Sequence, residues 1–207
     1  MKLNAAKTKE MVIHFRKTPL VLPPIIINNA ALQRVEHFKI LGVWLSDNLK
    51  WDYHVDKLVS KANQRIYYLK QLKKSGLSLD DLLCFYCSIV RSVLEYACQA
   101  WHPGLTQGHI DRLEALQRRA LKIMMPEASY ELALQISELE TLSQRREKLC
   151  QKFFVKMCHP DHRLNYLLPD ERAVKRHTRA NNTYHEPKWN NKRFKSNFTT
   201  HCLLNMQ

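Results

Sequence analysis

Four sulfur and imidazole side chains lie close enough in the sequence to suggest metal chemistry. Cys150, Cys158, His159 and His162 bring soft ligands near the expected end of a helix. Their spacing matches no standard structural zinc site. We therefore predict no metal and no cofactor for the chain, and we leave these four residues as a cluster for metal analysis to check.

Cys84 and Cys87 form a C-x-x-C pair, a spacing found in zinc and redox sites. The pair falls in the middle of an expected helix, and no second pair stands at zinc spacing. Thiols in such positions usually pack as small apolar groups. We therefore predict a core-packing role for both.

The sequence His159-Pro160-Asp161 has the H-x-D form that opens the iron triad of 2-oxoglutarate oxygenases. The third ligand would be one of the downstream histidines His177, His185 or His201. That triad needs a β-rich scaffold, and residues 160–207 show no run of alternating strands. The chain has 4 glycines and no G-x-G-x-x-G motif, which disfavours methyl transfer on a cofactor-binding α/β sheet. Neither activity is expected.

A basic stripe on one expected helix is the best candidate for binding. Lys57, Lys61 and Arg65 recur at i, i+4 and i+8 along the edge of an apolar face, so their stems pack while their charges align. Tyr68 and its neighbour Tyr67 could stack on a base or sugar. The alternative is a solvated helix face. We predict contact with a phosphate backbone, and a salt slope of binding lower by about two to three units when the three cations become Ala.

The composition favours polyanionic partners. Lys and Arg outnumber Asp and Glu by 33 to 19, which gives a net charge of +14. The surplus lies on both sides of residues 127–158, where five basic and five acidic residues balance. The 6 cysteines follow no framework spacing, the N-terminus has no apolar leader, and no apolar run is long enough to span a bilayer. We expect reduced thiols, no membrane contact, and an intracellular protein, nuclear or cytoplasmic.

Residues 1–50 are expected to form a short antiparallel β meander. Apolar and β-branched runs predict strands at Met11–Phe15, Ile25–Ile27, Leu32–Val35 and Phe38–Leu45. Asn28-Asn29 tolerates the positive φ of a tight hairpin, and Gly42 suggests a bulge or close backbone approach inside the last strand.

From Trp51 onward the apolar period becomes helical. The first helix is expected to end at Ser75-Gly76. Further helices are predicted from Ser78 to about Ala97, from Thr106 to Pro126, and at Tyr130–Ile136 and Thr141–Met157. The fold class is therefore α+β, with a short meander, a mainly helical bundle and a basic, loosely ordered tail.

Four stretches, in this order, resemble the reverse transcriptase of non-LTR (LINE-type) retrotransposons. They are Leu3–Met11, Phe38–Val43, Leu49–Trp51 followed by His54, and Tyr86–Trp101. The first resembles the end of the palm, the second the hairpin that supports the primer, and the others the thumb. Arg193–Phe198 resembles the end of such reading frames. The resemblance implies a C-terminal fragment with the end of the palm at 1–50, a thumb-like domain at 51–158 and a tail at 159–207.

The resemblance also tells us which catalytic groups to look for. In that family carboxylates, including an aromatic-x-Asp-Asp turn, hold two metal ions, and this sequence begins after the expected place of that turn. Asp80-Asp81 instead stands at a helix start, where acidic residues favour the helix dipole. Lys7 lies where the family's palm lysine assists the leaving pyrophosphate, with no metal site opposite it. We therefore expect no enzymatic activity.

Residues from about His54 to Pro103 also resemble the N-terminal, non-catalytic region of the AlkB-type homologue that modifies tRNA. This second resemblance favours a helical protein-interaction module as the alternative. The function that we predict is non-catalytic, sequence-tolerant contact with the backbone of RNA or an RNA–DNA duplex. A partner protein over the surface that the palm would cover, and a decayed element without selected activity, are left open.

Overall fold

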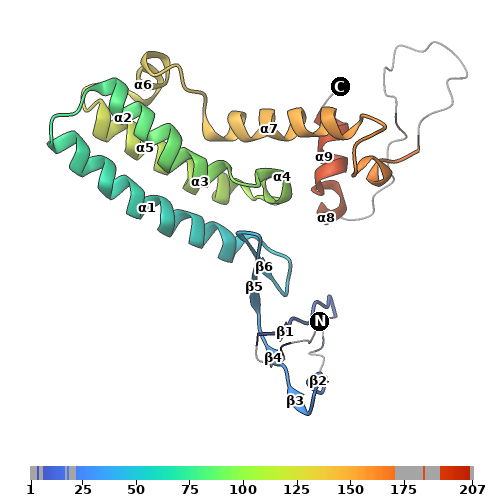
Figure 1. Cartoon of the computed structure of the whole chain (residues 1–207). Helices are drawn as coiled ribbons and strands as arrows, with labels where there is room; N and C mark the ends of the chain where they lie inside the picture. The colour runs from blue at the N-terminus through green and yellow to red at the C-terminus, as the bar shows by residue number, and fades with distance from the viewer. Residues whose placement is uncertain are drawn as a thin grey trace, which may run out of the picture. The chain divides into compact units, whose positions relative to one another are not determined.

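The computed structural model describes residue 4, residues 7–16, residue 18, residues 22–170, residue 184 and residues 192–205. By its internal contacts the chain divides into two units, Met1–Lys57 and Leu58–Gln207. Short strands come first and helices follow, so the fold class is α+β, as predicted (Figure 1). The division falls inside the first helix, later than the predicted end of the meander at residue 50.

In the described part of Met1–Lys57 the strands form separate two-stranded ladders, so the predicted single meander is wrong. β1 (Lys9–Glu10) runs parallel to β4 (Gln33–Arg34), while β2 (Ile26–Ile27) with β3 (Ala30–Ala31) and β5 (His37–Ile40) with β6 (Val43–Ser46) are antiparallel. The predicted strand at Met11–Phe15 is also wrong, because these residues pair with no strand. A polar anchor fixes β1 instead: the buried Glu10 carboxylate lies 2.6 Å from Arg34 and accepts the Ile25 N–H at 3.0 Å.

Two tight turns join the antiparallel strands. Asn28 and Asn29 have φ of 50° and 60° and connect β2 to β3, which confirms the predicted hairpin turn. Leu41 and Gly42 have φ of 45° and 90° and connect β5 to β6. Positive φ at both central residues is the turn geometry that matches strand twist in a two-residue hairpin. Gly42 therefore lies in a turn and not in a bulge, so the predicted single strand Phe38–Leu45 is wrong. Phe38–Val43 instead spans a hairpin, as the family resemblance implied.

The first helix, α1 (Asp52–Lys74), follows the predicted apolar period. Within the unit Leu58–Gln207, α1 contributes four buried side chains, Leu58, Ala62, Ile66 and Leu69. Gly76, at φ 81°, follows the end of the helix in the left-handed conformation that glycine adopts without strain. The predicted stop at Ser75-Gly76 is confirmed.

The next predicted helix is divided into consecutive helical segments. These are α2 (Leu79–Phe85), the π-helical turn η1 (Tyr86–Arg91) and α3 (Ser92–Glu95). Ser78 caps α2, because its hydroxyl accepts the Asp81 N–H at 3.2 Å. Ala97, at φ 50°, separates α3 from α4 (Cys98–Trp101), which is followed by the 3-10 turn η2 (His102–Gly104).

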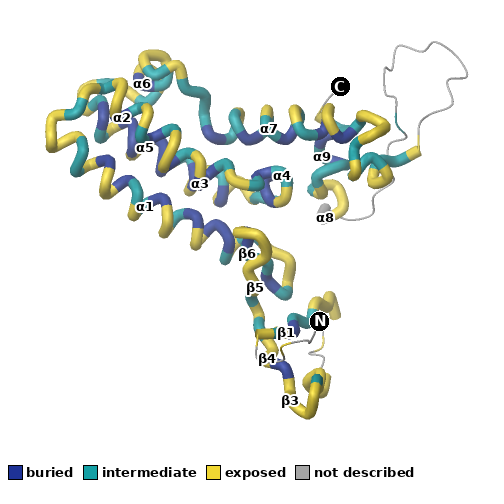
Figure 2. The backbone as a smooth tube through the Cα atoms, viewed as in Figure 1, coloured by how far each residue is buried: buried dark blue, intermediate teal, exposed yellow. Residues whose placement is uncertain are grey.

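Three further helices contribute buried side chains to the core of Leu58–Gln207: α5 (Gln107–Met124), α6 (Tyr130–Ile136) and α7 (Leu142–Met157). Capping boxes at Thr106 and Thr141 start α5 and α7. α7 packs against α3, α4, α5 and α9 (Phe198–Asn205). Figure 2 shows the buried positions along α5 and α7. The predicted bounds of these helices are confirmed.

The expectation of a loosely ordered tail fails for its last described segment. α8 (Lys192–Lys195) and α9 are helical, and in α9 Thr200 and Cys202 are buried. The Phe198 ring lies 5.6 Å from the Phe153 ring, centroid to centroid, so apolar contact with α7 orders this segment. Residues 171–183 and 185–191 of the expected tail lie outside the described residues. Within the described part of the chain, none of the helices has the length and hydropathy needed to span a bilayer.

Candidate functional site

The predicted basic stripe lies on α1, beginning near its first turns. Lys57 is exposed, and its ammonium nitrogen lies over two aromatic rings, 4.8 Å from the centroid of Tyr53 and 5.9 Å from that of Trp44. His54 fixes this corner, because its Nδ1 accepts the Trp44 N–H at 3.3 Å. Burial lowers the pKa of His54 to about 4, so its ring is neutral at pH 7. The charge of Lys57 is therefore held on an aromatic surface.

The other predicted residues of the stripe differ in how free each side chain is to contact a ligand. Arg65 is half-buried and its Nη1 donates to the main-chain carbonyl of Ile89 in η1, so it fastens α1 to that turn. Lys61 is exposed and has no partner among the residues that the structure describes. Tyr68 is 59% exposed and meets Tyr67 edge-on, with centroids 5.8 Å apart. Lys61 and Tyr68 are thus the members most open to a ligand.

The acidic pair and the palm-like lysine occupy ordinary surface positions. Asp80 and Asp81 are exposed in the first turn of α2, and the Asp81 carboxylate accepts the Ser78 hydroxyl at 2.6 Å. This confirms the predicted helix start. Lys7 is exposed in a turn.

The cysteines and histidines that suggested metal chemistry do not converge. Cys150 is buried, and its hydrogen bond to Cys98, together with burial, raises the pKa of its thiol. The ring Nδ1 atoms of His159 and His162 accept main-chain N–H groups at 3.4 and 3.2 Å. Within the described ranges no group of three or more His, Cys, Asp or Glu is placed to hold a metal ion. His177 and His185 lie outside those ranges.

The C-x-x-C pair differs from its prediction. Cys84 is exposed and Cys87 is half-buried, so the predicted core role is wrong for Cys84. The π-helical turn that begins at Tyr86 changes the helical phase here. Burial raises the pKa of Cys87.

A buried polar network connects α4, α7 and α9, and it was not predicted from the sequence. Arg146 is completely buried, and its Nε donates to His102 Nδ1 at 3.3 Å. Its guanidinium carbon lies 5.7 Å from the Trp101 ring centroid, and neither Nη atom has a hydrogen-bond partner in the described part of the chain. Burial lowers the pKa of Arg146. The centre of this network is therefore a buried cation, Arg146, and removing its charge from water costs free energy.

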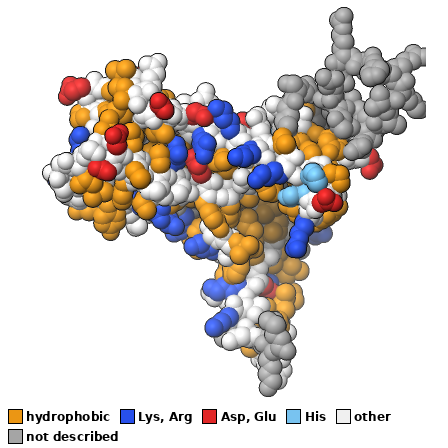
Figure 3. Space-filling view, turned by 45° about the horizontal axis from the view of Figure 1, so that its top comes forward, with side chains coloured by type: hydrophobic (Ala, Val, Ile, Leu, Met, Phe, Trp, Pro, Cys, Tyr) orange, Lys and Arg blue, Asp and Glu red, His pale blue; other side chains and the backbone are white. Residues whose placement is uncertain are grey.

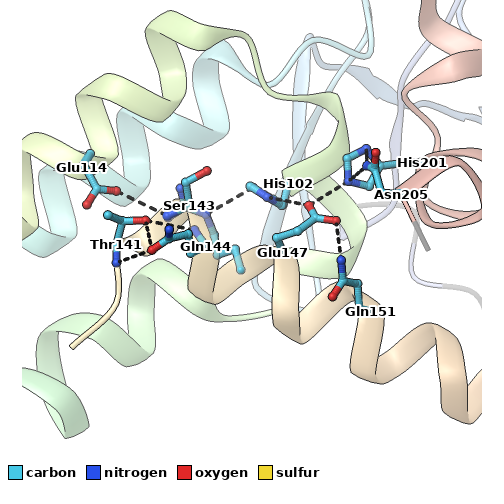
Figure 4. A network of polar contacts seen from close by, with 10 residues as sticks. His102, Glu114, Thr141, Ser143, Gln144, Glu147, Gln151, His201 and Asn205 are labelled. Carbon is cyan, nitrogen blue, oxygen red and sulfur yellow. Dashed lines mark hydrogen bonds and ion pairs between the residues drawn. The ribbon is translucent and has the colours of Figure 1, made fainter. Parts of the chain in front are cut away.

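Glu147 joins two histidines in the same network (Figure 4). Its Oε2 lies 2.8 Å from His201 Nε2 on α9 and 3.5 Å from His102 Nε2. Because His102 Nδ1 accepts from Arg146, its ring proton lies on Nε2, facing Glu147. Burial, and next the charge of Arg146, lower the pKa of His102 to about 4. The network fastens α9 to α7 through Oε2 of Glu147, while Oε1 accepts the Gln151 side-chain amide at 3.5 Å.

Glu114 of α5 positions the start of α7. Its two carboxylate oxygens accept the N–H groups of Leu142 and Ser143, each at 3.3 Å, and Tyr130 donates its hydroxyl to the same group. A carboxylate at a helix N-terminus satisfies otherwise unpaired donors and favours the dipole. The N-terminal half of α7 is therefore fixed twice, by Glu114 at Leu142 and Ser143 and by the histidine network at Arg146 and Glu147.

A second basic stripe runs along the outer side of α7. We call Arg145, Lys148, Lys152 and Lys156 the α7 basic face. Lys148, Lys152 and Lys156 repeat the i, i+4, i+8 spacing seen on α1, and like charges at that spacing destabilise a helix by about 0.2–0.5 kcal/mol a pair. The spacing was visible in the sequence, but the balanced charge of residues 127–158 concealed it. The fold shows that Glu147, the one acidic residue within α7, contacts His102 and His201.

Comparison with known proteins gives two partial similarities. The sequence profile of the family described as alkylated DNA repair protein AlkB homolog 8, N-terminal, matches residues 51–92. A Drosophila melanogaster protein described as a probable RNA-directed DNA polymerase from transposon X-element is 28% identical over 126 residues, which cover 59% of this chain and 13% of that protein. The chain therefore spans a small part of this relative. Both resemblances seen in the sequence are found, and no solved structure matches the chain.

Proposed function

We propose that this chain is a non-catalytic nucleic-acid-binding module that contacts the phosphate backbone of RNA or an RNA–DNA duplex without sequence preference. The carrying observation is the α1 stripe, where exposed Lys61 and Tyr68 stand beside the partly engaged Lys57 and Arg65. Similarity to a transposon RNA-directed DNA polymerase and the net charge of +14 support the same class of ligand.

The non-catalytic part of the proposal rests on the acidic residues. The Asp80-Asp81 pair serves as the start of α2, where Asp81 exchanges hydrogen bonds with Ser78. A polymerase needs carboxylates placed together around metal ions. We expect no primer extension when the purified chain is given a primed template, nucleotides and Mg²⁺. Extension above that of a buffer control would refute this part.

A pair of matched double variants tests the α1 stripe. K61A/Y68A removes the two available members, whereas K70A/Y166A makes the same chemical change at exposed positions outside the stripe. Lys70 is exposed and lies about 180° around the helix from Lys61, and Tyr166, which is 77% exposed, lies outside α1. Binding of a fluorescent RNA–DNA duplex is measured by anisotropy at several salt concentrations.

K61A/Y68A should lower the salt slope by about one unit, because one phosphate contact is lost. It should also weaken binding at every salt concentration through lost stacking. K70A/Y166A should leave both quantities near those of the unchanged chain. Equal effects of the two double variants would remove the α1 stripe from the proposal.

The second candidate is a helical protein-interaction module. The match of residues 51–92 to a non-polymerase family favours it, and Leu132 and Ile136, one turn apart on α6, are 46% and 51% exposed. Two results together would favour this candidate over the first. The chain would not bind the duplex at any salt concentration, and it would bind a protein partner that the L132S/I136S variant no longer binds.

A further inference from the structure

Charge on the α7 basic face is only partly neutralised by its own protein. Lys152 and Lys156 are exposed and have no partner among the residues that the structure describes. Lys148 lies 2.7 Å from Glu140, but its side chain is 63% exposed, so this ion pair exchanges readily with another anion. In Figure 3, Lys and Arg side chains form a row across this part of Leu58–Gln207.

The carboxylates near this face are already occupied. Glu95 is shared between Arg91 at 3.2 Å and Arg145 at 3.4 Å. Glu147, on α7 itself, is held by His102 and His201. With the buried Arg146 counted beside Glu147, the six cations of this region meet three carboxylates, and three positive charges are left over.

We propose that the α7 basic face contacts successive phosphates of one strand of a double-stranded nucleic acid. Lys148 and Lys156 are eight residues apart, about 12 Å along the helix, which corresponds to roughly three phosphates of a duplex strand. Repeated like charges on one helical face break a local rule of helix stability, and such departures are expected at functional positions. The inference deepens the proposed nucleic-acid function and rests on it.

The structure favours a nucleic acid over a lipid surface. A helix that lies in a membrane interface inserts an apolar face beneath its cations. In α7 that apolar face is already used, because Leu142, Cys150, Phe154 and Met157 are buried against the neighbouring helices. The outer face carries the lysines and one exposed large apolar side chain, Val155 at 58%, which is too little apolar surface for insertion, whereas the charge suits a hydrated phosphate backbone.

The α7 basic face is also more available than the α1 stripe. On α1, Lys57 is stacked on aromatic rings and Arg65 is bonded to Ile89. On α7 both Lys152 and Lys156 extend from a helix whose position is fixed by Glu114 and Glu147. We therefore assign to α7 the larger share of the salt-dependent binding.

The test compares K152Q/K156Q with the control K70Q/K74Q in the full chain. Lys70 and Lys74 are likewise exposed, without a partner in the described residues, and lie on one helix at i, i+4. Glutamine keeps the helix propensity, so the folded state is retained, which circular dichroism checks. The probe is a 20-base-pair RNA–DNA duplex, with vesicles containing phosphatidylserine as a second probe.

K152Q/K156Q should lower the salt slope by about two units. Between 50 and 200 mM salt the increase in Kd should therefore be about tenfold smaller for this variant than for the unchanged chain. K70Q/K74Q should leave the slope unchanged. A normal slope in K152Q/K156Q, while the unchanged chain still binds, overturns the α7 assignment and leaves the proposed function standing. Absence of salt-dependent duplex binding by the unchanged chain, or binding to the vesicles alone, overturns both.

Discussion

Acidification should destabilise Leu58–Gln207 through one residue, His102. In the folded protein burial and the charge of Arg146 lower its pKa to about 4, against an ordinary value of 6.5. Between these two values the unfolded chain binds a proton that the folded chain rejects. Stability is therefore fully present above pH 6.5 and is lost as the pH falls toward 4. From pH 7 to pH 5 this loss amounts to about 2 kcal/mol.

Urea unfolding of the unchanged chain and of H102Q at both pH values measures this contribution. Glutamine can still accept from Arg146 and donate to Glu147, but it does not titrate. Between pH 7 and pH 5 the free energy of unfolding of H102Q should fall by about 2 kcal/mol less than that of the unchanged chain. His54, whose pKa burial also lowers to about 4, titrates in both proteins and cancels in the comparison. Equal pH dependence in the two proteins would refute the neutral, buried His102.

Three further changes test the contacts that hold the fold, each measured by urea unfolding at pH 7. E114Q should cost about 1 kcal/mol, because the start of α7 loses a charge that favours its dipole; an unchanged stability would contradict this. Q117L should cost about 1–3 kcal/mol by leaving the buried Tyr86 hydroxyl without its 2.7 Å acceptor, and Y86F/Q117L should recover part of that loss. L41N should stabilise the chain by about 0.5–1 kcal/mol, because Leu41 is 88% exposed at φ 45°, a conformation that asparagine tolerates better. A lower stability would argue against that turn.

The helices could be predicted from the sequence because apolar period and capping residues agree. Ser78, Thr106 and Thr141 each stand where a helix begins, and the hydroxyl of each accepts the main-chain N–H three residues further on. The short strands could not be predicted from apolar runs. β1 exists because Glu10 binds Arg34 and Ile25, partners that a local pattern does not reveal.

The polar network was missed for a related reason. In the sequence Arg146 and Glu147 look like two surface charges in a balanced segment. The buried position of Arg146 and the half-buried position of Glu147 depend on His102, in the turn after α4, and on His201, in α9. The same long-range contacts turn Glu147 away from the lysines of its own helix. The α7 basic face follows from this arrangement and from no single motif.

Duplex binding across a range of salt concentrations tests the central claim most directly. We expect the logarithm of the association constant to fall linearly with the logarithm of salt concentration, with a slope of about −4 if Lys61, Lys148, Lys152 and Lys156 each neutralise one phosphate. Two duplexes of unrelated sequence should give the same slope and affinity. A slope near zero, or strong preference for one of the two sequences, would contradict the account.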